Sequence, residues 1–226
     1  GRVMTPTLAL VVEREAAISG FKKEKFYTVA LDCGKFSAVS GRCENRKAAD
    51  HLAAACYGQA AVVNKVEKKQ KSVQSPKLYD LTSLQRDGNR IFGYTAQQVL
   101  DYAQALYEKK LLTYPRTDSN YLTEDMRDTL PGLCEAAISA LPFPVTVSGV
   151  DAARVTDNAK VNDHHALLPT NQMAGVDLSA LPAGERNLLT LVTIRLLCAV
   201  GEKQVYEDTE AEITCGGGLF TAKGRV

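Results

Sequence analysis

The sequence predicts an α+β protein in which a helical segment is inserted into a β-rich one. Apolar and polar residues alternate over much of residues 24–74 and 205–226, whereas residues 76–203 carry apolar side chains at helical spacing. The composition is that of a folded globular chain, because 45% of the 226 residues are hydrophobic and 23% are charged. A helical domain inserted into a discontinuous β domain is the simplest architecture, and a single mixed α+β domain is the alternative.

The first 20 residues are expected to form a helix. Thr5 offers an N-cap hydroxyl, Pro6 follows at the first helical position, and Gly20 suits the C-terminal end. The β-rich segment that follows is expected to contain a hairpin over residues 24–40, a short helix over residues 46–57 and a long strand over residues 59–74.

The helical segment is predicted to begin with a helix over residues 80–92, with Leu81, Leu84 and Ile91 facing inward. Thr95 and Gln98 form a capping box for the next helix, because each side chain can bond the other residue's backbone amide. The remaining expected elements are an irregular stretch over residues 113–119, a helix capped by Thr123, a loop over residues 156–172, a helix over residues 183–201, and a final hairpin turning at Gly216, Gly217 and Gly218.

Positive and negative side chains nearly balance, with 27 Lys and Arg against 26 Asp and Glu and a formal net charge of +1. This balance excludes a uniformly basic nucleic-acid coat but not a local basic groove. The lysine-rich long strand, with Lys65 and Lys68, predicts either a wall that follows DNA phosphates or a solvated strand face. The acidic counterpart comes near the end of the chain, at Glu207, Asp208, Glu210 and Glu212.

Membrane and metal sites find no support in the sequence. No apolar run approaches the ~18 residues that a membrane-spanning helix needs. The six cysteines include no C-x-x-C pair, and the three histidines add no zinc-ligand spacing. We therefore expect a cytoplasmic protein with free thiols, no membrane segment and no metal site of its own.

The segment Leu112–Ser119 places a tyrosine and an arginine on an extended backbone. Pro115 keeps Tyr114 out of helical geometry, so Tyr114 and Arg116 are expected to point the same way. A phenol oxygen can attack phosphorus while a guanidinium holds the non-bridging oxygens, which suits phosphoryl transfer. The alternative is a packed loop tyrosine with Arg116 paired to Asp118.

A polar loop over residues 162–170 contains two of the three histidines, His164 and His165. Histidine can move protons near neutral pH, which makes either side chain a candidate acid or base. A metal site would need a third ligand, and none lies at helical or hairpin spacing. The other alternative is a capping or surface histidine.

Taken together and in order, four segments resemble the type IA DNA topoisomerases, most of all the bacterial topoisomerase III branch. The matching stretches are Gly1 to Glu15, Pro76 to Arg86, Leu112 to Ser119 and His164 to Thr170. The tyrosine segment and the Leu-Tyr-Asp-Leu block at residues 78–81 are the most specific of these.

The resemblance implies a role for each matching residue. Tyr114 corresponds to the nucleophile that cuts one DNA strand and holds a 5′-phosphotyrosine, and Arg116 corresponds to the arginine that positions the scissile phosphate. His164 corresponds to the histidine of a proton relay near the tyrosine. The DNA-binding and supporting residues are then Arg2, Thr117, Asp118 and Ser119, to which the basic strand adds Lys65 and Lys68.

The resemblance also implies a toroidal fold, in which a helical tyrosine domain is carried by a β arch. Residues 1–22 would be the end of the helical base domain, residues 23–75 and 205–226 the arch, and residues 76–204 the tyrosine domain. The implied partner is single-stranded DNA, which a monomeric enzyme would bind in the bacterial nucleoid.

In this family Mg²⁺ and a catalytic lysine belong to a Toprim domain that would precede Gly1, and this chain contains no D-x-D cluster. We expect the chain to be a central piece of a longer enzyme, inactive by itself and without bound metal. A tyrosine recombinase is an alternative, although here the tyrosine precedes the histidines. A non-catalytic module that binds single-stranded DNA is the other.

Overall fold

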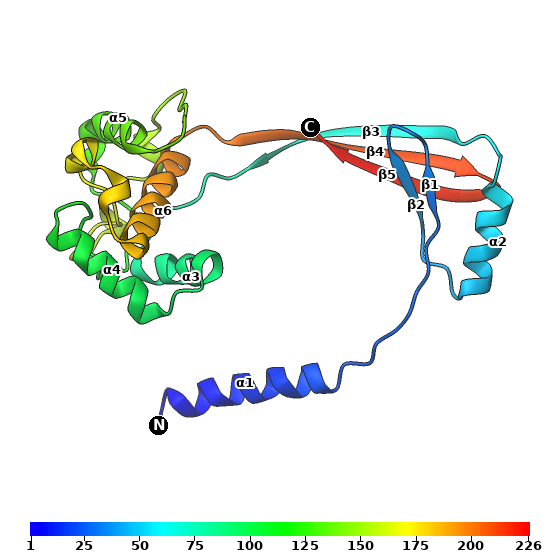
Figure 1. Ribbon diagram of the computed structural model, residues 1–226, viewed down its shortest axis with the longest axis horizontal. Helices are drawn as coiled ribbons and strands as arrows, with labels where there is room; N and C mark the ends of the chain where they lie inside the picture. The colour runs from blue at the N-terminus through cyan, green and yellow to red at the C-terminus, as the bar shows by residue number, and fades with distance from the viewer. The chain divides into compact units, whose positions relative to one another are not determined.

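The computed structural model describes residues 1–226, which separate into two compact units (Figure 1). Unit 1 comprises residues 1–71 and 206–226, and unit 2 comprises residues 72–205. Unit 1 is therefore discontinuous in sequence, while unit 2 is a single stretch of chain. None of the helices combines the length and the apolar character that crossing a membrane would need.

Unit 1 is built on a five-stranded antiparallel sheet with the strand order β1-β2-β5-β4-β3. Its elements in chain order are α1 (Met4–Ser19), β1 (Ala30–Asp32), β2 (Ser37–Ser40), α2 (Arg46–Cys56), β3 (Val62–Val73), β4 (Gln204–Cys215) and β5 (Gly218–Arg225). The two longest strands, β3 and β4, are neighbours in the sheet although more than 130 residues separate them in sequence.

The core of unit 1 lies between α2 and the sheet, at the end where β4 turns into β5 (Figure 1). Gly216 and Gly217 form that turn with φ of 54° and 79°, a left-handed conformation that suits glycine. A Cβ on Gly216 would also lie 2.5 Å from the carbonyl carbon of Ala55, so α2 packs directly on the turn. Buried side chains from both strands and from α2 complete the cluster, among them Phe220 and Ile213.

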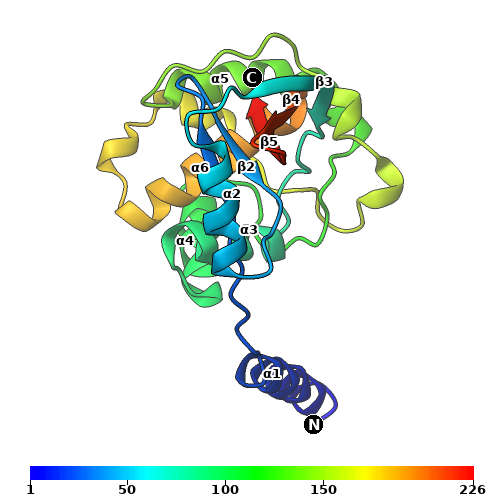
Figure 2. The same cartoon turned by 90° about the vertical axis from the view of Figure 1, so that its right-hand side faces the viewer.

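Unit 2 is helical, and Figure 2 shows its helices gathered around α6. The α-helices are α3 (Leu81–Phe92), α4 (Ala96–Glu108), α5 (Leu130–Ala140) and α6 (Ala183–Val200). Short 3₁₀ helices connect them, namely η1 (Glu124–Thr129), η2 (Ala152–Arg154), η3 (Asn158–Lys160), η4 (Asn171–Gly175) and η5 (Leu178–Ala180). Helix α6 is buried on most sides, since it contributes Leu188 and Val192 to a cluster with α3 and α4, and Leu196 and Val200 to a cluster with α5.

Several local predictions are confirmed. The capping box is present, with the Thr95 amide donating to Gln98 Oε1 at 2.9 Å and the Gln98 amide donating to Thr95 Oγ1 at 3.2 Å. The two hairpins, the long strand and the helix over residues 183–201 all occur within a few residues of their expected bounds.

Three local predictions are wrong. Helix α1 starts at Met4 with Val3 at its N-cap, so Thr5 lies inside the first turn and is not the cap. The side chain of Ile91 is 46% exposed instead of facing inward. Thr123 makes no side-chain cap bond, and a 3₁₀ helix rather than an α-helix follows it.

Candidate active site

The segment that carries Tyr114 is tied by hydrogen bonds to the segment that carries His164. The Thr113 amide donates to the carbonyl of Leu168 at 2.9 Å, and the Leu168 amide donates to the Thr113 hydroxyl at 3.0 Å. Leu112 also forms an isolated antiparallel bridge with Pro169. These short-range contacts hold the two loops side by side, although about 50 residues separate them in sequence.

Thr117 and Ser119 strengthen this connection from inside the protein. Both side chains are buried, and the Thr117 hydroxyl donates to the carbonyl of His164 at 3.0 Å. The Ser119 hydroxyl donates to the carbonyl of Lys160 at 2.8 Å, and the Leu81 amide donates to the carbonyl of Thr117 at 3.0 Å. The two hydroxyls thus shape the loop, while Asp118 between them is exposed.

Tyr114 and His164 are in direct contact. Their ring centroids lie 4.6 Å apart, with an angle of 49° between the ring planes. Both residues line a small hollow of about 180 Å³, together with Asp163 and His165. The hollow has room for a few small groups, and it presents a phenol, two imidazoles and one carboxylate.

The two histidines differ in their surroundings. His165 is half-buried, and its Nδ1 lies 2.7 Å from the carbonyl oxygen of Ala166, a contact that fixes its ring. His164 is exposed and touches Tyr114. Of the pair, His164 is therefore the imidazole that is exposed beside the phenol.

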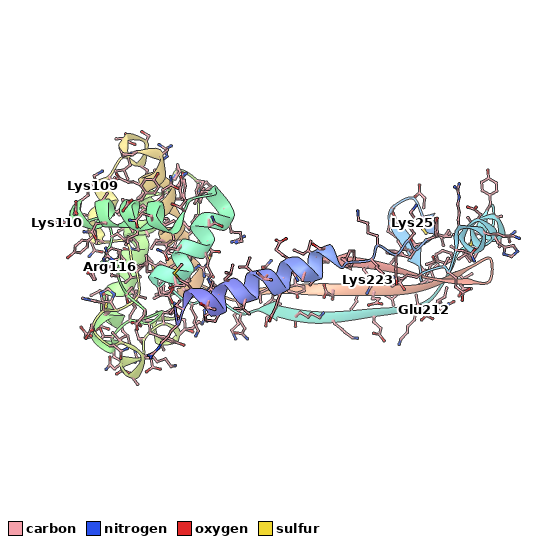
Figure 3. All side chains as sticks on the ribbon, turned by 90° about the horizontal axis from the view of Figure 1, so that it is seen from below. Lys25, Lys109, Lys110, Arg116, Glu212 and Lys223 are labelled. Atoms are coloured by element: carbon pink, nitrogen blue, oxygen red, sulfur yellow. The ribbon has the colours of Figure 1, made fainter.

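Arg116 is exposed and forms no ion pair with Asp118 or with any other carboxylate. The alternative of a closed Arg116–Asp118 pair is therefore wrong. Figure 3 labels Arg116 on unit 2, and the guanidinium keeps all of its donors for an outside anion such as a phosphate.

The predicted DNA contacts of unit 1 have different surroundings. Arg2 is exposed just before α1 and has no carboxylate partner. Lys65 and Lys68 are exposed on β3, but each ammonium is already paired, Lys65 with Glu67 at 2.5 Å and Lys68 with Glu207 at 2.8 Å. On the long strands, lysines therefore meet carboxylates of the same sheet.

Two carboxylates of these long strands, Glu67 and Asp208, have a lowered pKa. Hydrogen bonds from Lys65 and Lys69, with their charges, lower the pKa of Glu67 to about 2. Hydrogen bonds from Arg225 and then Lys71 lower the pKa of Asp208 to about 2 as well. Both carboxylates stay ionised over the physiological range and keep the lysine ammoniums occupied.

A second network, which the sequence did not reveal, lies next to the histidine loop. The Tyr79 hydroxyl donates to Asp87 at 2.6 Å, and Arg195 from α6 donates to both of them while its guanidinium stacks on the Tyr79 ring. Burial and the contact with Asp87 raise the pKa of Tyr79, whereas the donors around Asp87 outweigh its burial and lower its pKa. The Tyr79 carbonyl accepts the Leu167 amide at 2.8 Å, so this network anchors the histidine loop.

Sequence reasoning also missed two residues next to Tyr114. The Tyr107 ring meets the Tyr114 ring edge to face, with 5.5 Å between centroids. Lys110 has a φ of 58°, which is rare for a residue with a side chain. The signal for Lys110 was its position just after the end of α4, where glycine is the usual residue.

The residues around Tyr114 do not fit a Mg²⁺ site. Mg²⁺ takes oxygen ligands in octahedral geometry, usually with one or two carboxylates and a phosphate, and Asp163 is the single carboxylate in the hollow. No group of three His, Cys, Asp or Glu side chains in the chain is arranged to hold a metal ion.

Comparisons with known proteins agree on one family. A family model described as DNA topoisomerase matches residues 1–226. The protein DNA topoisomerase 3 of Bacillus licheniformis is 38% identical over 245 aligned residues, which cover 100% of this chain and 32% of the relative. DNA topoisomerase 3 of Bacillus subtilis is 36% identical over 239 residues, with the same coverage.

A solved structure, full-length topoisomerase I from Thermotoga maritima, has a similar fold. It superposes with a TM-score of 0.73 and 24% identity, and the match covers 100% of this chain and 38% of that protein. The chain thus spans about a third of the length of the curated relatives that it matches.

Proposed function

Because the chain belongs to the type IA DNA topoisomerase family, we propose that it is part of an enzyme that cuts, passes and rejoins single DNA strands. Such an enzyme would relax negative supercoils or decatenate DNA. The observation that carries the proposal is the contact between Tyr114 and the exposed His164. The segment of Tyr114 also presents the unpaired Arg116.

The proposed chemistry is a transesterification. The Tyr114 oxygen attacks the scissile phosphorus, the bond from phosphorus to the 3′ oxygen breaks, and the 5′ phosphate stays on the tyrosine. The 3′ oxygen leaves as a hydroxyl after it takes a proton, and the reverse attack rejoins the strand. His164 would hold or move the proton at the Tyr114 oxygen, and Arg116 would bind the non-bridging phosphate oxygens.

We propose the family's domain plan for the chain. The boundaries of the two compact units, at residues 71–72 and 205–206, lie close to those expected for a tyrosine domain over residues 76–204 within an arch over residues 23–75 and 205–226. Residues 1–22 would then be the end of the helical base domain, and they contain α1, none of whose residues is buried. An exposed helix of this kind is suited to packing against further protein.

The proposed partner is single-stranded DNA, bound by a monomeric enzyme. In unit 2, Arg116 and Asp118 are exposed for contact, with Thr117 and Ser119 as supports. Arg2 stays a predicted contact, and so do Lys65 and Lys68, whose ammoniums would have to exchange a carboxylate for a phosphate. Mg²⁺ would be held by carboxylates of another part of the enzyme, so the chain alone is proposed to be inactive.

A second candidate function is a non-catalytic module that binds single-stranded DNA. The lack of fit for Mg²⁺ around Tyr114 favours it for the isolated chain. A salt titration distinguishes phosphate contacts, which weaken steeply as salt rises, from an absence of binding.

The proposed function is tested on the full-length parent enzyme. The enzyme is mixed with labelled single-stranded DNA and Mg²⁺ and then denatured, and covalent adducts are separated by electrophoresis. Tyr114→Phe should abolish the adduct, while Tyr121→Phe, a matched change in the same unit, should retain it. An adduct that persists in Tyr114→Phe, or one linked through a 3′ phosphate, would contradict the proposal.

A further inference from the structure

Tyr114 lines two hollows, and the proposed cleavage accounts for the smaller one alone. The second is a groove of about 510 Å³ that Tyr114 shares with Tyr107, Glu108, Lys110 and Thr170. Its volume lies within the range of small-molecule binding sites. No residue of this groove other than Tyr114 has a part in the chemistry described above.

The groove presents an exposed aromatic ring next to the reactive phenol. Tyr107 is 41% exposed, and it meets the Tyr114 ring edge to face at 5.5 Å between centroids. The Tyr114 ring supports the Tyr107 ring edge to face, and the exposed face of Tyr107 is one on which a nucleic-acid base can stack whatever its sequence.

Lys110 provides the positive charge of the groove. Its ammonium has no carboxylate partner, whereas that of the adjacent Lys109 is held by the buried Glu185 at 2.6 Å (Figure 3 labels both lysines). An exposed and unpaired ammonium is able to bind a phosphate oxygen.

The backbone of Lys110 is fixed in a conformation that disfavours side chains. Its φ is 58°, its amide donates to the carbonyl of Tyr107 at 2.8 Å, and its own carbonyl accepts the Thr170 hydroxyl. Glycine would adopt this conformation without strain, whereas the lysine side chain carries a backbone penalty here. Strained residues of this kind are concentrated at functional sites.

We propose that this groove holds one nucleotide of a single DNA strand beside the scissile phosphate, with the base against the Tyr107 ring and a flanking phosphate on Lys110 Nζ. The inference rests on the proposed function, because it takes its substrate class from the role of Tyr114. Glu108 lies at the same groove and opposes a phosphate there, which places the phosphate on the Lys110 side.

The test uses the full-length parent enzyme carrying Tyr114→Phe, which keeps the ring and removes the nucleophilic oxygen, so that no result depends on cleavage. Binding of a fluorescent single-stranded oligonucleotide is measured by anisotropy over a series of salt concentrations. Lys110→Gln should weaken binding at low salt and reduce the slope of log K against log salt by about 0.7, the value for one phosphate contact. Lys110→Arg should restore both.

Two further changes separate charge from backbone and base from phosphate. Lys110→Gly relieves the backbone strain but removes the ammonium. It should therefore reduce the slope of log K against log salt as much as Lys110→Gln does. Tyr107→Ala should weaken binding about tenfold, while Tyr107→Phe keeps the ring and should bind normally. Glu108→Gln should tighten binding, since it removes a charge that repels phosphate.

The proposal is overturned if Lys110→Gln and Lys110→Gly keep the salt slope of the Tyr114→Phe enzyme, or if Tyr107→Ala binds as well as Tyr107→Phe. Should Tyr107→Ala unfold the chain, photocrosslinking of a 5-iodouracil oligonucleotide replaces it, with a cross-link at Tyr107 expected and cross-links elsewhere alone contradicting the proposal. Failure of the proposed function is seen separately, as an adduct that survives Tyr114→Phe in the full-length enzyme.

Discussion

The long strands of unit 1 and the tyrosine loop of unit 2 use their positive charges in different ways. On β3, Lys68 and Lys71 are held by Glu207 and Asp208 of β4, at 2.8 Å each. Around Tyr114, Arg116 and Lys110 have no carboxylate partner. The net charge of +1 therefore does not show that some cationic side chains are paired within the sheet while others are free to bind a ligand.

This contrast shows that a lysine-rich stretch of sequence is weak support for a nucleic-acid site. The basic pattern of β3 is neutralised by a strand that lies 139 residues away in sequence at the Lys68–Glu207 pair. A single arginine in a short irregular loop carries more information, because its local structure leaves it unpaired and next to a candidate nucleophile.

The sharpest test of the contrast compares Arg116→Ala with Lys68→Gln in the full-length enzyme. Loss of one donor to a developing phosphate charge typically slows a reaction by about 10²- to 10³-fold, and we expect a reduction of that size in the rate of adduct formation for Arg116→Ala. Lys68→Gln should change the rate far less, because its ammonium is already engaged with Glu207. Single-turnover measurement of the adduct with saturating DNA gives both rates.

A lysine is the matched control for the arginine. Arg116→Lys keeps the charge but loses the planar, two-pronged geometry, so it should recover part of the rate. If Lys68→Gln were as damaging as Arg116→Ala, the distinction between paired and unpaired cations would fail.

The turn between β4 and β5 gives the next largest expected effect, now on the stability of unit 1. Both Gly216 and Gly217 have positive φ, so alanine should cost about 1–2 kcal/mol of strain at either position. At Gly216 the new Cβ would also lie 2.5 Å from the Ala55 backbone, whereas nothing lies within 4 Å at Gly217. Gly216→Ala should therefore lose about a further 1–3 kcal/mol, measured as the difference between the two variants in urea unfolding.

Equal losses in the two glycine variants would mean that α2 moves away from the turn without penalty. In that case the packing of α2 on the sheet would be looser than the buried cluster around Phe220 and Ile213 indicates. Gly34, another turn glycine with positive φ and open space around it, offers a second reference for strain alone.

Local rules account for the parts of the fold that the sequence predicted well. The capping box at Thr95 and the glycine turn after β4 depend on neighbouring residues, so their patterns are readable directly. The Tyr114 segment was also identifiable, because Pro115 fixes the local backbone and the surrounding residues match a family motif. By contrast, helix α1 carries an apolar pattern and yet buries none of its residues.

The parts of the site that depend on distant contacts could not be predicted. The hydrogen bond from Thr117 to the His164 carbonyl and the Tyr107–Tyr114–His164 ring contacts arise where segments far apart in sequence meet. The same holds for the triad of Tyr79, Asp87 and Arg195, whose members come from three places in the chain. Residue spacing in the sequence does not indicate such contacts, because they form only when the tertiary fold brings the segments together.

The smallest expected effect concerns the ion pairs of β3 and β4 and their dependence on pH. Hydrogen bonds from Arg225 and Lys71 lower the pKa of Asp208 to about 2, below the ~3.9 of an aspartate in an unfolded chain. A lowered pKa means that Asp208 stabilises the folded state above about pH 4 and that this contribution is lost as the pH falls from about 4 through 2. Asp208→Asn should therefore make the melting temperature decline less steeply between pH 4 and 2. At pH 7 the same change should lower the melting temperature slightly.

Glu212→Gln is the matched control, because Glu212 is exposed on the same strand and belongs to no ion pair. It should leave the decline between pH 4 and 2 close to that of the unchanged chain. The titration itself can be followed through the carboxyl carbon of Asp208 by NMR, with a midpoint near pH 2 expected. A midpoint near 4 would show that Asp208 does not hold Lys71 and Arg225, and Lys71 would then be as available to phosphate as Arg116 is.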